Sequence, residues 1–278
     1  MKHLYLNLKR FDVPPAYGGV NRLAPGERWG ACVVERTQEA LACYDCAETE
    51  FVQFFPEAHI IGALSACRPG GPVRVGCQGV YRADTAVGGN FGAFTTSRTA
   101  NSMRALGCVH TIIGHCEERV DKKGVLAEAG TADSGAVNRL LNQEILRAQE
   151  AGLKVLYCIG ETGEEQPDWE RVLGEQLDVG LEGADREGVV IAYEPVWSIG
   201  PGKTPAGKAY IARTARFIKD RTGGLDVVYG GGLKRDNAAM LASIEDIDGG
   251  LVALTRFEGE IGFYPEEYLE IIRLYLGE

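Results

Sequence analysis

Eight short apolar segments recur along the chain, and helical patterns or loops separate each one from the next. They comprise residues 4–8, 51–55, 73–78, 108–114, 154–159, 189–193, 226–229 and 250–253. Short apolar runs bounded by turn residues are typical of buried strands. No linker and no change of composition interrupts the alternation across the 278 residues. The pattern therefore predicts an α/β fold, a single (β/α)8 barrel that occupies residues 1–278 as one domain.

Helical spacing between these runs supports the same architecture. The predicted helices comprise residues 28–43, 57–66, 98–106, 134–151, a segment from Asp168, and residues 206–221, 236–244 and 265–276, with Ser134 as a helix N-cap. A doubly wound open sheet is the alternative, but it normally has a glycine-rich turn after its first strand, which this chain lacks. In a barrel, the loops that follow the strands form one face, where catalytic residues gather.

Composition argues against several kinds of partner. The formal net charge of -10 repels nucleic acid and anionic membranes. No apolar run is long enough to span a bilayer, and residues 1–9 contain too short an apolar stretch for a signal peptide. We therefore expect a cytoplasmic protein that binds neither nucleic acid nor membrane.

The 8 cysteines are scattered, and several lie in or beside strand-like runs. This usage fits reduced thiols that pack as small apolar side chains. Cys43 and Cys46 form a C-x-x-C pair, but no second Cys or His pair lies at zinc-ligand spacing. We interpret them as two packing or surface thiols on a helix, and we predict no metal site.

Residues 189–205 read VVIAYEPVWSIGPGKTP and join a predicted strand to a long loop. The apolar run stops at Glu194 and Pro195, which places the Glu194 carboxylate at a strand end. The residues that follow, up to Pro205, are too rich in Gly and Pro for regular structure and are long enough to form a lid. A carboxylate beneath a lid is suited to removing a proton away from water.

Other polar residues follow the predicted strands in the same way. They are Asn7 and Lys9 after the first strand, Gln78 after the third, His115 and Glu117 after the fourth, and Gly230, Gly231 and Gly232 after the seventh. Each alone has an ordinary structural explanation, such as a surface lysine, a solvated acid or a tight turn. Together they place an amide, a cation, an imidazole and a carboxylate on one rim, which suits proton transfer beside a carbonyl.

Five segments also resemble motifs of the triosephosphate isomerase family, and the resemblance runs nearly end to end. They are Asn7-Leu8-Lys9, Ile113-Gly114-His115-Cys116-Glu117, Cys158-Ile159-Gly160-Glu161-Thr162, Ala192-Tyr193-Glu194-Pro195-Val196-Trp197-Ser198-Ile199-Gly200 and Tyr229-Gly230-Gly231. The segment around Glu194 is the most specific. The resemblance implies an aldose–ketose isomerase of glycolysis and gluconeogenesis that interconverts glyceraldehyde 3-phosphate and dihydroxyacetone phosphate through an enediolate. It implies a small phosphorylated sugar as substrate and neither a metal nor an organic cofactor.

The resemblance also implies a role for each of five residues. Glu194 would be the base that moves a proton between neighbouring carbons, and neutral His115 would polarise the carbonyl and pass protons between the two oxygens. Lys9 would stabilise the enediolate and attract the anionic substrate. Asn7 would lie beside Lys9, and Glu117 would orient Lys9 from behind.

Departures from the family occur where it binds the substrate phosphate through backbone N–H groups of three loops. The corresponding positions here are Gly200, Gly231, Gly232, Ala253 and Leu254. Gly232 replaces a serine, and Ala253-Leu254 replaces a Gly-Gly pair, so the donors survive only if the backbone does not need positive φ at 253 and 254. Arg256 either adds a charged contact to an anion or is the surface residue that starts the next helix.

The expected lid contacts change at matching points. In the family, a Tyr hydroxyl and a Ser hydroxyl bind backbone N–H groups of the closed lid. Here Tyr229 faces Pro205, which has no N–H, and the second hydroxyl is absent at Gly232. Losing two hydrogen bonds would favour an open lid by about tenfold or more unless other contacts replace them.

The family's dimer loop, Gly-Ala-Phe-Thr-Gly-Glu, reads Gly-Ala-Phe-Thr-Thr-Ser at residues 92–97. The arginine that pairs with its Glu is Glu118 here, so both members of one ion pair are changed, and Arg98 offers a pair of reversed sign. We expect a homodimer. The loops at residues 12–26 and 83–90 also look longer than is usual in the family.

Two further hypotheses accompany triosephosphate isomerase activity. The first is isomerisation of another small phosphorylated sugar, such as a tetrulose phosphate, because Glu194, His115 and Lys9 serve both reactions equally. The second is a catalytically silent relative with a binding or regulatory role, which only the two lost lid bonds support.

Overall fold

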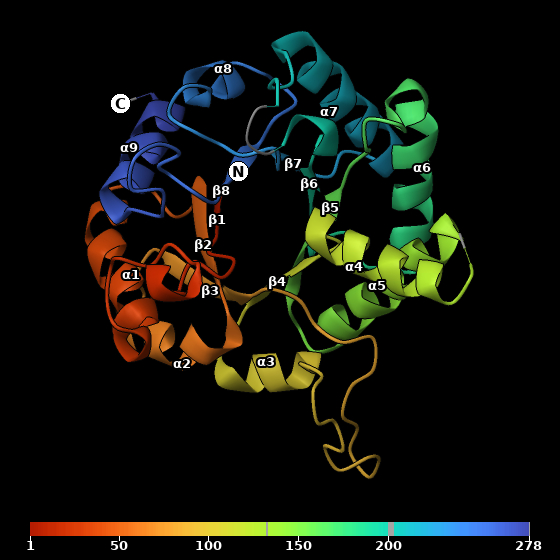
Figure 1. The fold of residues 1–278 in the computed structure, drawn as a ribbon, viewed down its shortest axis with the longest axis horizontal. Coiled ribbons are helices and arrows are strands. Elements are labelled where there is room, and N and C mark those ends of the chain that lie inside the picture. The colour runs from red at the N-terminus through yellow and green to blue at the C-terminus, as the bar shows by residue number, and fades with distance from the viewer. Residues whose placement is uncertain (132, 200–202, 278) are drawn as a thin grey trace.

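In the computed structural model, which describes residues 1–131, 133–199 and 203–277, eight parallel strands close into a barrel (Figure 1). The strands are β1 (Lys2–Asn7), β2 (Thr49–Phe55), β3 (Val73–Cys77), β4 (His110–Ile113), β5 (Lys154–Ile159), β6 (Val189–Tyr193), β7 (Val227–Tyr229) and β8 (Gly249–Val252). Each strand pairs with its sequence neighbours, and β1 pairs with β8 to complete the ring. The predicted (β/α)8 barrel is confirmed.

Helices surround the barrel in chain order (Figure 1). They are α1 (Gly26–Leu41), α2 (Glu57–Ala66), α3 (Ala100–Leu106), α4 (Cys116–Glu128), α5 (Ser134–Glu150), α6 (Trp169–Gly180), α7 (Lys208–Thr222), α8 (Ala238–Ala242) and α9 (Pro265–Leu276), with short 3-10 turns η1 (Pro15–Tyr17), η2 (Gln166–Asp168) and η3 (Val196–Ser198). Among the described residues, no helix is long and apolar enough to cross a membrane.

Two packed layers form the core. Alternate strand residues such as Val52, Phe54 and Leu156 fill the barrel interior. Their neighbours, such as Phe51 and Phe55, pack outward against the helices. This alternation follows from the two-residue period of a strand and explains why the strands read as continuous apolar runs.

The sequence predictions erred at several local points. Helix α4 was not predicted. The N-cap of α5 is Asp133, whose side chain accepts a hydrogen bond from Ala136 N at 3.1 Å, and not Ser134. Cys43 and Cys46 are exposed, which agrees with their interpretation as surface thiols. They follow the end of α1, however, and do not lie on a helix.

A cluster of charged and aromatic side chains occupies the N-terminal end of the barrel. His3 bridges Glu50 through Nδ1, at 3.0 Å, and Asp226 through Nε2, at 2.9 Å. The Tyr5 hydroxyl donates to Glu50 at 2.9 Å, and His110 Nε2 lies 3.2 Å from the same carboxylate. Polar groups at this end of a barrel are associated with stability, because the catalytic loops lie at the other end.

Two segments depart from short connections. The loop between β3 and α3 extends away from the barrel (Figure 1), and it fully exposes Val87 and Phe91. At the C-terminal end of the strands, the residues after β8 turn back on themselves through an antiparallel bridge between Arg256 and Gly262. This hairpin contacts the loop after β1, where Arg22 Nη1 donates to Ile261 O at 3.2 Å.

Candidate active site

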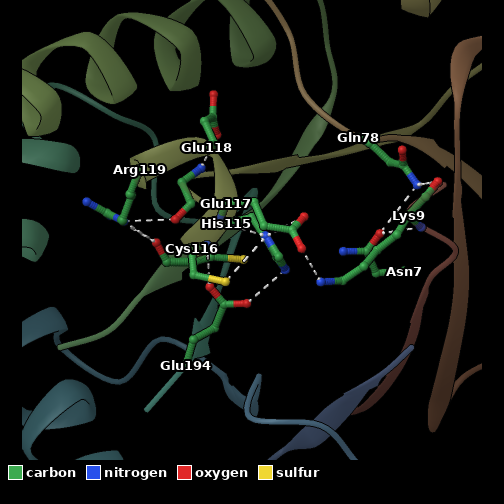
Figure 2. Close-up of polar contacts among 11 residues, drawn as sticks. Asn7, Lys9, Gln78, His115, Cys116, Glu117, Glu118, Arg119 and Glu194 are labelled. Carbon is green, nitrogen blue, oxygen red and sulfur yellow. Dashed lines mark hydrogen bonds and ion pairs between the residues drawn. The ribbon is translucent and has the colours of Figure 1, made fainter. Parts of the chain in front are cut away.

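The end of β1 holds Lys9 in an unusual backbone conformation. Its φ is +39°, in the left-handed region that residues other than glycine rarely adopt. The Asn7 side chain accepts a hydrogen bond from Lys9 N at 3.0 Å, and Gln78 Nε2 donates to Lys9 O at 3.1 Å. Gln78 Nε2 also lies 3.3 Å from Asn7 Oδ1 (Figure 2). These contacts hold a strained turn in place, as is common at functional sites.

Lys9 and Glu117 form an ion pair across the rim. Lys9 Nζ lies 2.7 Å from Glu117 Oε1 (Figure 2). Partial burial would raise the pKa of Glu117, but the hydrogen bond and charge of Lys9 outweigh it and hold that pKa below its ordinary value. Glu117 is largely exposed, so this pair positions the ammonium group more than it stabilises the fold.

His115 follows β4 and is the N-cap residue of α4. Its Nδ1 accepts a hydrogen bond from Glu117 N at 3.3 Å. A nitrogen that accepts an N–H carries no proton itself, so this contact assigns the ring a neutral tautomer with the proton on Nε2. Nε2 lies 3.2 Å from Glu194 Oε1. The nitrogen able to donate a proton therefore faces the site.

Glu194 follows β6 and is only 2% exposed. Its Oε2 accepts a hydrogen bond from Cys116 N at 2.9 Å (Figure 2). Burial raises the pKa of Glu194, and the neighbouring His115 ring, the Cys116 N–H, Lys9 and Arg119 offset only part of that rise. A carboxylate with a raised pKa is a stronger base, which suits proton removal from carbon.

Arg119 supports this site from α4, and the sequence analysis did not find it. The buried guanidinium donates to Gly114 O at 2.8 Å and to Cys158 O at 2.9 Å, and so it joins the ends of β4 and β5 (Figure 2). It also donates to Asn138 Oδ1 at 2.9 Å. The turn that carries His115 is thereby fixed to the neighbouring strand.

Glu161 was also missed as a functional candidate, although it follows β5 as the catalytic candidates follow their strands. It is fully buried, and its Oε1 accepts hydrogen bonds from the Tyr193 hydroxyl at 2.9 Å, Trp197 Nε1 at 2.7 Å and the Tyr210 hydroxyl at 2.9 Å. Trp197 lies in η3, just after Glu194. Glu161 therefore anchors the start of the loop that begins at the candidate base, and the strand-end rule applied to every strand would have selected it.

The loops after β7 and β8 lie beside Glu194. A Cβ placed on Gly230 would lie 2.7 Å from Glu194 Cγ, so only glycine fits there. The backbone N–H groups of the next residues donate to no acceptor in the described parts of the chain. These are Gly231, Gly232, Ala253 and Leu254. Four such N–H groups on two adjacent loops are suited to holding an anion.

Comparison with known proteins agrees with this geometry. A model of the family described as triosephosphate isomerase matches residues 33–273. A triosephosphate isomerase of Halorhodospira halophila is 34% identical over 253 residues, which cover 86% of this chain and 90% of that protein. One of Alkalilimnicola ehrlichii is 34% identical over 247 residues, covering 84% and 88%. The chain belongs to the triosephosphate isomerase family.

A solved structure, a triosephosphate isomerase from Bartonella henselae, has the same fold. It superposes with a TM-score of 0.70 and covers 99% of each chain at 24% sequence identity. The family assignment confirms the resemblance on which the isomerase prediction depends. The roles of the individual site residues stay predictions.

The loops that are expected to bind phosphate keep their backbone N–H groups. Among the described residues other than glycine, only Lys9 and Phe91 have positive φ, so Ala253 and Leu254 adopt ordinary backbone conformations. The backbone therefore does not need positive φ at residues 253 and 254, and their N–H groups remain available as donors. Gly232 has a φ of +97°. Gly200, the remaining expected phosphate contact, lies outside the described residues.

The structure contradicts one of the two interpretations of Arg256. Its Nε donates to Glu267 Oε1 at 2.8 Å, and its guanidinium carbon lies 3.7 Å from the centre of the Tyr264 ring. The arginine is therefore engaged by Glu267 of α9 and by Tyr264, and a contact with an anion stays a prediction. Arg256 does not start the next helix, because it belongs to the hairpin and that helix begins at Pro265.

Tyr229, which was expected to lose a lid contact because of Pro205, is buried. Burial raises its pKa, and the side chain of Ser198 beside the hydroxyl opposes part of that rise. Pro205 is exposed. Ser198, which lies in η3 after Glu194, is therefore a neighbour of the Tyr229 side chain.

One group of side chains in the described ranges has metal-ligand proximity. It consists of His115, Cys116 and Glu194, whose ligand atoms lie within 4.8 Å of one another. Burial and the charge of Glu194 raise the pKa of Cys116 to about 12, so this cysteine is a protonated thiol at neutral pH.

Proposed function

We propose that this protein interconverts glyceraldehyde 3-phosphate and dihydroxyacetone phosphate, the aldose–ketose isomerisation of its family. The observation that carries the proposal is the buried carboxylate of Glu194, which has a raised pKa and lies 3.2 Å from His115 Nε2. A strong base beside a proton donor is what the transfer between two neighbouring carbons requires. The family places this reaction in glycolysis.

Each residue has one step in the proposed mechanism. Glu194 removes a proton from the carbon beside the carbonyl and returns it to the neighbouring carbon. His115 donates its Nε2 proton to the carbonyl oxygen as the enediolate forms and recovers a proton from the other oxygen. Lys9 stabilises the negative charge on these oxygens, where a fixed cation is most effective because water is excluded.

Supporting residues position these groups. Asn7 holds the strained turn at Lys9, and Glu117 orients the Lys9 ammonium group. The free N–H groups of Gly231, Gly232, Ala253 and Leu254 would bind the phosphate of the substrate, since an anion fixed there orients the reacting carbons.

An isomerase of another small sugar phosphate, such as a tetrulose phosphate, is the second candidate. It is favoured by the changes that surround the proposed phosphate site, where Leu254 supplies a bulky side chain and the hairpin of residues 255–262 follows β8. The same proton-transfer groups would serve the longer sugar. Only the space around the substrate would differ.

One assay separates these candidates. The purified protein is given glyceraldehyde 3-phosphate or phosphorylated tetroses, beside the variant Glu194→Gln. Turnover of the triose that is lost in the variant supports the first function, and turnover of tetroses alone supports the second. Absence of turnover on every sugar phosphate would mean a silent relative and would reject both.

We also propose a homodimer and a cytoplasmic location. The extended loop between β3 and α3 presents Val87 and Phe91 to solvent, and such exposed apolar side chains favour contact with another subunit. All eight cysteines are free thiols, which suits a reducing compartment.

A further inference from the structure

We propose that Lys234 is an additional phosphate-binding residue, whose ammonium group supplies charge that the neighbouring N–H groups lack. The inference rests on the proposed function, because it concerns the anionic end of the same substrate. Lys234 lies in the loop after β7, two residues beyond Gly232. Its side chain extends from this loop toward the loop after β8, and both loops carry free N–H groups.

The ammonium group reaches from one loop to the other. Lys234 Nζ lies 4.2 Å from the centre of the Phe257 ring, which follows β8. The aliphatic part of the side chain passes over Gly232, since a Cβ placed on that glycine would lie 3.3 Å from Lys234 Cε. The side chain therefore runs past Gly232 and ends beside Phe257, which places the ammonium group between the loops that carry the two pairs of N–H groups.

The contact between Lys234 Cε and Gly232 gives a physical reason for the glycine that replaces the family's serine at position 232. A side chain at position 232 would crowd Lys234 Cε, so the missing hydroxyl and the position of the ammonium group belong together. In place of a neutral hydroxyl, the protein has a charged donor. Charge-assisted hydrogen bonds to phosphate are shorter and stronger than neutral ones.

The loop backbone is fixed so that Lys234 stays in position. Asn237 accepts a hydrogen bond from Lys234 N at 2.8 Å and donates to Gly232 O at 2.9 Å. Leu233 N donates to Leu251 O at 3.0 Å, which ties the loop to β8. Preorganised donors bind an anion without the cost of ordering a loop.

An ordinary surface lysine would be expected to have a carboxylate partner or to be fully solvated. Lys234 is half-buried, and no carboxylate oxygen of the described residues lies within 4.0 Å of its ammonium group. The adjacent Arg235, in contrast, is exposed and forms an ion pair with Glu270 at 2.9 Å. In a protein with a formal net charge of -10, a cation without a carboxylate partner beside free N–H groups offsets repulsion of a phosphate dianion.

Binding of inorganic phosphate tests the inference without any need for turnover. Isothermal titration at pH 8 compares the unaltered protein with Lys234→Met, which keeps the length and apolar packing of the side chain. We expect phosphate affinity to fall by about tenfold, as for loss of one charged hydrogen bond. Lys234→Arg should restore most of the affinity, and added salt should weaken phosphate binding less in Lys234→Met.

Arg235→Gln is the matched control, because it removes the neighbouring charge, which faces Glu270. It should bind phosphate as the unaltered protein does. Equal phosphate affinity in Lys234→Met and the unaltered protein would overturn the inference, as would absence of phosphate binding in the unaltered protein.

Turnover of glyceraldehyde 3-phosphate separates this inference from the proposed function. An active enzyme whose phosphate affinity and KM do not depend on Lys234 would refute only the inference. An inactive protein whose phosphate affinity does depend on Lys234 would refute only the isomerase function. If both hold, Lys234→Met should raise KM for the phosphorylated substrate more than it lowers kcat.

Discussion

Glu194 illustrates how the chemistry of one residue depends on its surroundings. Its carboxylate is nearly inaccessible, and the donors around it offset only part of the cost of burying a charge. The pKa therefore lies above the ordinary value of 4.5. Because the base must be deprotonated to act, activity should be lost as pH falls through this raised pKa.

We predict that the acidic limb of kcat/KM for the isomerisation lies above pH 4.5, and that the pH-rate profile measured between pH 4 and 8 will reveal it. Glu194→Asp keeps the carboxylate but withdraws it from the substrate, and a displacement of about 1 Å costs roughly a hundredfold in rate. An acidic limb at or below the ordinary pKa, with the fold intact, would contradict the assignment of Glu194 as a desolvated base.

At the scale of elements, α4 is the clearest case of a helix that serves the site. It begins directly after His115, and it places the Arg119 side chain in contact with the ends of β4 and β5. Its amphipathic pattern is weak, because Val120 and Val125 are exposed and Arg119 is the buried residue. A search for periodically spaced apolar residues does not detect a helix whose buried residue is charged. This explains why the sequence analysis missed α4.

Replacement of Arg119 by Met should destabilise the protein by about 2–4 kcal/mol, because buried carbonyl groups lose their donors. We expect kcat to fall as well, since the turn that carries His115 loses its contact with Cys158 O. Urea unfolding and steady-state kinetics measure the two effects. Lys123→Met, which removes an exposed cation of the same helix, is the control and should change neither.

The sequence pattern also explains which other elements and contacts could be predicted. The strands were found because parallel barrel strands are apolar on both faces. Asn7, Lys9, His115 and Glu194 were selected because they lie at or just after the ends of strands. The partners of Arg256 and Lys234 could not be found in this way. Those contacts depend on how the loops after β7 and β8 fold, and loop conformation is set by tertiary contacts.

At the scale of the molecule, the two ends of the barrel have different tasks. The N-terminal cluster carries no part of the proposed chemistry, yet its pKa shifts are marked. Burial would lower the pKa of His3, but its hydrogen bonds to Asp226 and Glu50 outweigh this and raise it above 6.5. The hydrogen bond of His3 lowers the pKa of Asp226 below 3.8.

The cluster therefore stabilises the fold in a defined pH window. The contribution of His3 is complete below pH 6.5 and is lost as pH rises through the folded pKa, whereas that of Asp226 is lost as pH falls below 3.8. We predict that His3→Asn lowers the unfolding free energy near pH 6 and lowers it less near pH 9. Urea unfolding across this range measures it, and a loss that does not depend on pH would refute it.

Assembly is the second property of the whole molecule that can be tested. If the loop between β3 and α3 enters a second subunit, Val87 and Phe91 become buried, and each contributes about 2 kcal/mol to association. We predict that the unaltered protein sediments as a dimer at micromolar concentration and that the double variant Val87→Ser, Phe91→Ser sediments as a monomer. A monomeric unaltered protein would contradict the proposed homodimer.

The pairing of β1 with β8 has a consequence for synthesis of the chain. His3 aligns with Gly249, so the first strand made waits for the last one before its second edge is covered. At the usual 5–20 residues per second, the wait lasts roughly 10–50 s. During that time an apolar strand edge is open to other chains. Release of nascent chains before residue 249 should therefore yield aggregates, whereas release of the complete chain should yield folded protein.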